Sequence, residues 1–278
     1  MVYFIGAGPG DKELITLKGM KILSAADCVI YAGSLVNPEL LGYAKPGCAL
    51  HNSAKMTLEE IIKIILNNEK DGLLTVRLHT GDPNIYGAVK EQIDILAANG
   101  VPYEIIPGVS SFAGAAAVLG AEYTLPGISQ TVILTRMEGR TPVPERERIA
   151  ELAKIQASMA IFLSSGMLPE LSEKLMEGGY PPGTPAAIVY KATWPDEKIM
   201  RTTVKGLPEA GAKGSISKTA IILVGNFLGG EGEYDRSFLY NPEFTHGYRT
   251  GRDTGQDAGR DAVRDTDQDA VRDAKTDE

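Results

Sequence analysis

The chain has 278 residues, of which 43% are hydrophobic and 23% charged, and its formal net charge is −8. This composition is typical of a globular enzyme and differs from that of collagen-like, coiled-coil or wholly disordered chains. The negative charge argues against nucleic acid as a partner. The longest run of small apolar residues, 112–121, is too short to cross a membrane, and no secretory signal is recognisable. We therefore expect a soluble, cytoplasmic protein with no membrane partner.

The residues that commonly bind metals are sparse. Cys28 and Cys48 form no CxxC pair, so we expect two reduced thiols and neither a disulfide nor a zinc site. His51 and His79 are isolated near predicted strand ends, where hydrogen bonding is the more frequent role of histidine. The sequence therefore predicts no metal site.

Short β-branched runs alternate with helical patterns along the chain, which predicts an α/β fold with mostly parallel sheets. Strands are expected at 2–6, 28–31, 73–79, 103–106, 131–135, 159–164, 186–190, 198–205 and 219–225. Helices are expected at 12–25, 57–68, 88–98, 111–121, 145–154 and 168–178, and Thr57 and Glu60 have the spacing of a capping box. Turn residues near 120–128 predict a boundary between an N-terminal α/β domain, 1–120, and a C-terminal α/β domain, 121–240.

The C-terminal segment 250–278 is an acidic tandem repeat. Residues 251–262 (GRDTGQDAGRDA) are followed by the similar 263–274 (VRDTDQDAVRDA), in which Val263 and Val271 are the only large apolar side chains. So few apolar groups cannot offset the entropy lost on ordering the segment. We expect a disordered tail that takes no part in the chemistry.

A glycine-rich turn, GAGPGD at 6–11, follows the first predicted strand. In the dinucleotide fingerprint GxGxxG the sixth position is glycine, whereas Asp11 stands here and its charge disfavours a phosphate. No GxxxxGK[ST] motif is present either, which excludes a P-loop. Asp11 is therefore either a plain helix N-cap or a group that faces a cationic or N–H-rich ligand.

Two further turns follow predicted strands. In the first, Gly81, Asp82 and Pro83 place a carboxylate at the carboxyl end of a strand, and in the second Ser110 and Ser111 place two hydroxyls there. Ligands of open α/β sheets bind at this edge. Together with the glycine turn, these residues indicate a pocket for a polar ligand that carries positive charge.

The motifs GAGPGD, TGDPNIYG, PGVSS and TAIILVGN, in this order over about residues 2–228, resemble the tetrapyrrole methylase family, the class III S-adenosylmethionine-dependent methyltransferases. The resemblance implies two α/β domains with mixed, mostly parallel sheets, a cofactor cleft between them, and a homodimer. It also implies S-adenosylmethionine as cofactor and a tetrapyrrole as substrate.

The resemblance further implies which residues bind each ligand. The residues implied at the cofactor are Gly81, Asp82, Ile85, Ser110, Ser111, Leu163, Ala192 and Ala220. The residues implied at the substrate are Pro9, Gly10, Asp11, Tyr86 and Arg136. Because the substrate carries many carboxylates, Lys55, Arg140 and Lys191 are further candidates for the rim. No catalytic base is identified.

Three stretches narrow the resemblance: 31–41, 119–136 and 185–199. They resemble the branch of the family that methylates C-11 of precorrin-4 or cobalt-precorrin-4, giving the corresponding precorrin-5 in cobalamin biosynthesis. Alternatives within the family are a methylase of uroporphyrinogen or another precorrin, a diphthine synthase and an rRNA ribose methylase, the last disfavoured by the net charge. A non-catalytic tetrapyrrole carrier is the alternative from another class.

Overall fold

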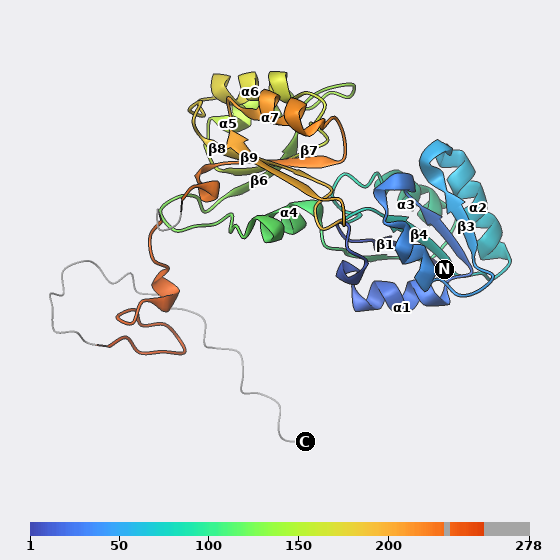
Figure 1. The fold of residues 1–278 in the computed structure, drawn as a ribbon. Helices are drawn as coiled ribbons and strands as arrows, with labels where there is room; N and C mark the ends of the chain where they lie inside the picture. Colours follow the sequence, from blue (N-terminus) through green and yellow to red (C-terminus); the bar gives the residue numbers. More distant parts are fainter. Residues whose placement is uncertain (231–233, 253–278) are drawn as a thin grey trace. The chain divides into compact units, whose positions relative to one another are not determined.

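The computed structural model describes residues 1–230 and 234–252 (Figure 1). The chain divides into a compact unit Met1–Asp235, which contains both sheets, and a second unit that begins at Arg236. Most of the acidic repeat expected at 250–278 lies outside the described residues. Within the described ranges, none of the helices is long and apolar enough to cross a membrane.

The first sheet is entirely parallel, with strand order β3-β2-β4-β1-β5. Its strands are β1 (Val2–Gly6), β2 (Cys28–Tyr31), β3 (Ala49–Asn52), β4 (Thr75–His79) and β5 (Tyr103–Ile106). Gly6 pairs with His79 and Ile5 pairs with Ile106, so β1, β4 and β5 end together. The turns that follow these three strands therefore emerge at one edge.

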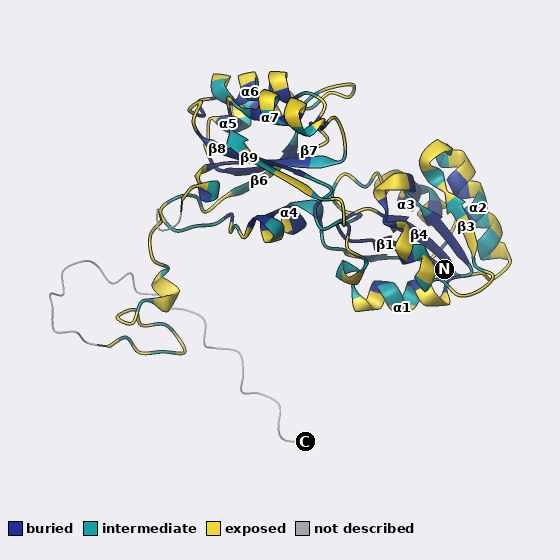
Figure 2. Ribbon diagram, viewed as in Figure 1, coloured by how far each residue is buried: buried dark blue, intermediate teal, exposed yellow. Residues whose placement is uncertain are grey.

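Helices cover both faces of the first sheet (Figure 2). Helices α2 (Leu58–Lys70) and α3 (Lys90–Ala98) pack on the face that carries Phe4 and Ile30. Helix α1 (Leu17–Ala25) packs on the opposite face. The predicted capping box is present at the start of α2.

The second sheet is mixed, with strand order β6-β7-β10-β8-β9. Its strands are β6 (Val132–Arg136), β7 (Ser158–Phe162), β8 (Pro185–Tyr190), β9 (Lys198–Thr203) and β10 (Ala220–Val224). Strands β6 and β7 are parallel, whereas β10 is antiparallel to β7 and β8, and β9 is antiparallel to β8. Since most strand pairs of the two sheets are parallel, the predicted α/β class is confirmed, and the predicted domain boundary at 120/121 falls between the sheets but stays a prediction.

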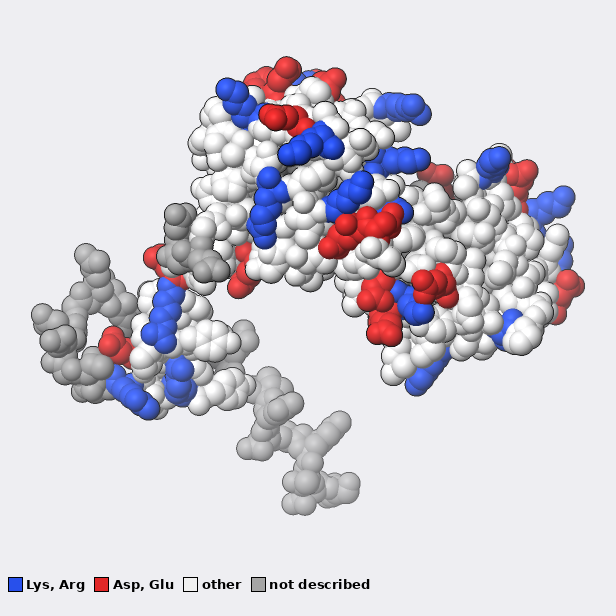
Figure 3. All heavy atoms as spheres, viewed as in Figure 1, with Lys and Arg blue, Asp and Glu red and all other residues white. Residues whose placement is uncertain are grey.

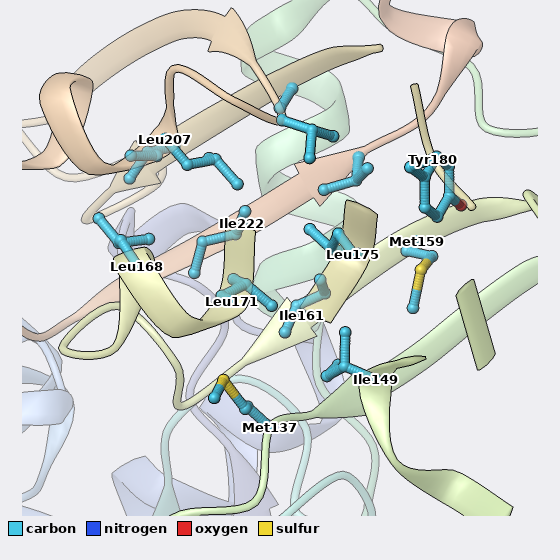
Figure 4. Close-up of a cluster of buried hydrophobic side chains, with 14 of the residues drawn as sticks. Met137, Ile149, Met159, Ile161, Leu168, Leu171, Leu175, Tyr180, Leu207 and Ile222 are labelled. Atoms are coloured by element: carbon cyan, nitrogen blue, oxygen red, sulfur yellow. The ribbon is translucent and has the colours of Figure 1, made fainter. Parts of the chain in front are cut away.

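The core of the second sheet lies under three helices, α5 (Ile149–Ala153), α6 (Leu168–Glu177) and α7 (Leu207–Gly214). Figure 4 shows Leu171 and Leu175 of α6 facing Ile161 of β7 and Ile222 of β10. Helix α4 (Ser111–Leu119) packs on the other face through small residues, and it ends at Gly120, which has the left-handed φ of 62°. The small side chains allow α4 to approach the sheet closely.

Several predicted elements differ from those observed. The helix expected at 12–25 is interrupted: a 3-10 turn at Lys12–Leu14 precedes α1, because Asp11 and Thr16 each cap a separate helix start. Similarly, 145–154 forms a 3-10 turn, Glu145–Glu147, followed by α5. Strand β3 and helix α7 were not predicted.

The second unit is described as far as residue 252. Its 3-10 turn, Phe238–Tyr240, is tied to the following segment by the Arg249 guanidinium, which donates to the carbonyl oxygens of Leu239 (2.9 Å) and Asn241 (2.6 Å). The backbone N–H of Arg252 donates to Pro242, so the ordered contacts of this unit extend to the last described residue.

Candidate functional site

The three predicted turns meet at the carboxyl edge of β1, β4 and β5. Gly8 and Gly81 exchange two backbone hydrogen bonds, with N···O distances of 3.3 and 2.9 Å. A Cβ atom on Gly108 would lie 2.2 Å from the carbonyl oxygen of Gly81 and 2.7 Å from the Cα of Gly6. The three backbones approach so closely that glycine is required at this crossing.

Asp82 joins two of these turns. Its Oδ2 accepts a hydrogen bond from the backbone N–H of Gly108 (3.1 Å), and its Oδ1 accepts from the backbone N–H (2.7 Å) and the side-chain amide (2.8 Å) of Asn84. A carboxylate offers roughly four acceptor positions, so capacity for a ligand donor remains. Asp82 therefore holds the turns together as well as being a candidate for ligand recognition.

The two predicted serines lie beside the Gly81 turn. A Cβ atom on Gly81 would lie 3.6 Å from the Cα of Ser110 and 3.7 Å from the N of Ser111. Ser110 occupies the N-cap position of α4 and is 7% exposed, but its hydroxyl makes no capping bond. The backbone N–H of Ile85 donates to Asp82, which closes the same turn. The structure thus brings the first five predicted cofactor residues together.

The second sheet contributes the turn after β7. Leu163 is 69% exposed at a φ of 53°, and its neighbour Phe162 contacts the Tyr86 ring, with centroids 5.3 Å apart. Burial raises the pKa of Tyr86, while the nearby charge of Arg136 opposes this shift. The predicted residues Leu163, Tyr86 and Arg136 therefore lie near one another.

Backbone strain is concentrated in the turns that follow β4, β7 and β8 and in the turn before β10. Residues other than glycine with positive φ include Tyr86, Ala88, Leu163, Lys191, Thr193 and Thr219. Such conformations cost about 1–3 kcal/mol each and cluster at functional sites. Ala192, which is buried, lies between two of the strained residues, and Ala220, at the start of β10, pairs with Tyr190.

The charged side chains predicted at the substrate are engaged within the chain. The Arg136 guanidinium donates to the carbonyl oxygens of Met137 (3.2 Å), Thr141 (3.2 Å) and Pro142 (2.8 Å). The exposed Asp11 carboxylate accepts from the backbone N–H of Glu13 as a helix N-cap. Their roles toward a substrate stay predictions.

The remaining rim candidates differ in setting. Lys191 forms an ion pair with Asp196 (2.6 Å), whereas Lys55 and Arg140 are exposed. On the face shown in Figure 3, basic and acidic side chains are interspersed. A surface cavity of about 550 Å³, lined by Tyr3, Leu17, Lys18, Lys21, Ile22 and Glu104, contains none of the predicted site residues.

Two buried polar residues of β4 were not singled out as a site by the sequence. The Arg77 guanidinium donates to Gln92 (3.2 Å) and to the carbonyl oxygen of Ile30 (3.1 Å), and burial lowers its pKa to about 10. Burial, together with Arg77, lowers the pKa of His79 to about 3, and its buried Nε2 has no hydrogen-bond partner among the described residues. In the part of the chain that the structure describes, no cluster of His, Cys, Asp and Glu suited to a metal ion occurs.

The sequence reasoning also missed three residues that hold the glycine turn: Asn37, Thr193 and Trp194. Asn37 donates to the carbonyl oxygen of Gly10 (2.8 Å), and Trp194 donates to that of Pro9 (3.0 Å). The sequence did hold one signal for these contacts. The single tryptophan of the chain, Trp194, lies in 185–199, a stretch whose sequence resembles the family.

Comparisons with known proteins agree on one family. The sequence model of the Tetrapyrrole (Corrin/Porphyrin) Methylases matches residues 1–208. The chain is 54% identical over 248 residues to a cobalt-precorrin-4 C(11)-methyltransferase of Methanocaldococcus jannaschii, covering 89% of this chain and 95% of the relative. It is 44% identical over 251 residues to a precorrin-4 C(11)-methyltransferase of Pseudomonas aeruginosa, covering 90% of this chain and 99% of the relative.

Solved structures agree with the sequence matches. The X-ray structure of a cobalamin biosynthetic enzyme, cobalt precorrin-4 methyltransferase, superposes with a TM-score of 0.81 at 50% identity and covers 82% of this chain and 96% of its own. The uroporphyrin-III C-methyl transferase of Thermus thermophilus, complexed with S-adenyl homocysteine, superposes with a TM-score of 0.70 at 28% identity, covering 82% of this chain and 98% of its own. The chain described here belongs to the tetrapyrrole (corrin/porphyrin) methylases.

Proposed function

We propose that this chain transfers a methyl group from S-adenosylmethionine to C-11 of precorrin-4 or cobalt-precorrin-4. The observation that carries the proposal is the 54% identity to a cobalt-precorrin-4 C(11)-methyltransferase over nearly its whole length. The contrast between structures supports the acceptor, because identity falls from 50% for the cobalt precorrin-4 enzyme to 28% for the uroporphyrin-III enzyme.

The chemistry of the turns fits S-adenosylmethionine. This cofactor supplies an activated methyl group on a sulfonium, and it carries an ammonium group and ribose hydroxyls but no phosphate. Asp82 offers acceptor capacity beside Gly81, and the Ser110 hydroxyl makes no bond to its own helix. Acceptors and hydroxyls suit such a ligand better than a phosphate cradle does.

The residues of the site act chiefly by orientation. Methyl transfer breaks a carbon–sulfur bond and forms a carbon–carbon bond in line, so the protein must align donor and acceptor, which contributes up to about 7–11 kcal/mol. In this proposal Gly81, Asp82, Ile85, Ser110, Ser111, Leu163, Ala192 and Ala220 hold the cofactor. Pro9, Gly10, Asp11, Tyr86 and Arg136 face the tetrapyrrole.

The wider proposal keeps the expected organisation. The domains 1–120 and 121–240 would provide the two sides of the cleft, two copies would form a homodimer, and the protein would work in the cytoplasm without nucleic acid or membrane partners. Sedimentation of the purified protein tests the dimer.

The experiment that tests the function is mass spectrometry of tetrapyrrole products. Purified protein is incubated with methyl-labelled S-adenosylmethionine and, separately, with precorrin-4, cobalt-precorrin-4 and uroporphyrinogen III. We expect the gain of one labelled methyl with a precorrin-4 form. Methylation of uroporphyrinogen III alone contradicts the acceptor, and tight tetrapyrrole binding without any methyl transfer identifies a carrier instead.

A further inference from the structure

Side chains distant in sequence hold the backbone at the end of the glycine turn. The Trp194 Nε1–H donates to the carbonyl oxygen of Pro9 at 3.0 Å. The backbone N–H of Asp11 donates to the Thr193 hydroxyl at 2.9 Å. Two consecutive residues of the turn after β8 thus hold the two ends of a three-residue segment, Pro9–Asp11, that follows β1.

Gly10 lies between these two bonds, and its lack of a side chain leaves room for the Trp194 indole. A Cβ atom at Gly10 would lie 2.0 Å from Cδ1 of Trp194 and 2.7 Å from the carbonyl oxygen of Ala192. The Asn37 amide donates to the carbonyl oxygen of Gly10 at 2.8 Å. The indole therefore occupies the space that a side chain would take, and hydrogen bonds with three side chains fix the loop.

The turn that holds the loop is itself constrained. Lys191 pairs with Asp196 at 2.6 Å, and its Nζ lies 5.0 Å from the centroid of the Trp194 ring. The backbone N–H of Thr193 donates to Glu197, and Thr193 has a φ of 69°. Because a β-branched residue rarely adopts this conformation, the strain is maintained by the surrounding contacts.

We propose that Thr193 and Trp194 are positioning residues for tetrapyrrole binding, which hold Pro9–Asp11 in the conformation that meets the substrate. The assignment of this loop to the tetrapyrrole rests on the proposed function. The Thr193 hydroxyl and the Trp194 N–H bond to Asp11 and Pro9 and not to a residue proposed to hold the cofactor. Removing either bond should therefore weaken tetrapyrrole binding more than cofactor binding. The turn after β8 thereby becomes a determinant of tetrapyrrole affinity.

The test uses a graded set of variants of the full chain. Thr193→Val removes the hydroxyl and keeps the shape, Thr193→Ser keeps the hydroxyl, and Trp194→Phe keeps a ring but removes the N–H donor. Thr131→Val, at an exposed position before β6, is the matched control. The readouts are amide exchange at Asp11, fluorescence of the single tryptophan in the threonine variants, the Kd for S-adenosylhomocysteine, and KM and kcat with precorrin-4.

We expect Thr193→Val and Trp194→Phe each to raise the KM for the tetrapyrrole about fivefold, because each removes one hydrogen bond that contributes ~1 kcal/mol. The kcat and the Kd for S-adenosylhomocysteine should each change by less than about twofold. Thr193→Val should also speed amide exchange at Asp11 and alter the tryptophan emission, while Thr193→Ser and Thr131→Val behave as the wild type.

Two results would overturn the proposal. One is an unchanged KM in both Thr193→Val and Trp194→Phe, and the other is a fall in affinity for S-adenosylhomocysteine that parallels the rise in KM. If the wild type methylates no precorrin-4 form, the proposed function fails. In that case the Kd of each variant for the tetrapyrrole that the protein does bind replaces KM, and unchanged tetrapyrrole affinity overturns the positioning role.

Discussion

Replacing Asp82 by alanine tests whether one carboxylate links the turns of the site. The structure gives this side chain three hydrogen bonds: one from Gly108 and two from Asn84. Asp82→Ala removes all three, and the N–H of Gly108, which is part-buried, loses its partner. The substitution therefore affects both the stability of the edge and the geometry of the ligand site.

The magnitude follows from the type of bond that is lost. Hydrogen bonds to a charged group contribute about 1.5–3 kcal/mol each. The two bonds from the exposed Asn84 contribute least to the unfolding free energy, because water replaces them when they are lost. We expect the free energy of unfolding to fall by about 2–4 kcal/mol. Affinity for S-adenosylmethionine should fall by roughly 1.5–3 kcal/mol if Asp82 also accepts from the cofactor.

Urea unfolding and calorimetry with S-adenosylmethionine measure the two effects separately. Asp71→Ala, at the exposed acid that follows α2, is the matched control and should leave both quantities unchanged. Unchanged unfolding free energy in Asp82→Ala would refute the bridging role. Reduced stability with wild-type affinity would remove Asp82 from the ligand contacts while keeping it as a link between the turns.

Three further predictions follow from particular contacts. Gly108→Ala should lower the unfolding free energy in urea by about 1–3 kcal/mol because its Cβ has no room. Gly183→Ala should leave it unchanged, since no described residue lies within 4 Å of that Cβ, and equal effects of the two substitutions would contradict the close approach of the backbones at Gly108. For His79, the unfolded chain binds a proton near pH 6.5 while burial and Arg77 lower the folded pKa to about 3, so stability is full above the unfolded pKa and is lost as pH falls between these values. As the pH falls over this range, the unfolding free energy of the wild type should decrease by about 1.4 kcal/mol per pH unit more than that of His79→Leu. Urea unfolding at a series of pH values measures both, and equal pH dependence of the two proteins would refute this. Removal of 253–278 should leave activity unchanged and shift Tm by less than about 2–4 °C, since its repeat has few apolar residues; a larger drop would mean that the segment packs on the rest.

Local chemistry made much of the edge predictable. Glycine, proline and an acid directly after a strand predict a turn, and parallel strands must end at a common edge, so Gly81, Asp82 and Ser110 were expected together. Strand β3 was missed because its residues are mostly exposed and show no alternation of apolar and polar side chains. Helix α7 was missed because Pro208 and its glycines weaken a helical pattern, although proline is tolerated in the first turn.

The contacts that fix the loop were not predictable in this way. Gly10 and Trp194 are brought together only by the tertiary fold, and no periodicity in the sequence relates them. The dual role of Asp82 was hidden for the same reason, because its bond to Gly108 joins turns that follow different strands. Sequence patterns report local conformation and burial, whereas these bonds depend on the register between strands.

The most direct test of the central claim is carbon NMR of the tetrapyrrole formed with ¹³C-methyl-labelled S-adenosylmethionine. If this chain methylates precorrin-4 or cobalt-precorrin-4, the label should appear as a single methyl group bonded to C-11. Label at any other ring carbon, or no label in either precorrin-4 form while another tetrapyrrole is methylated, would contradict the proposed reaction.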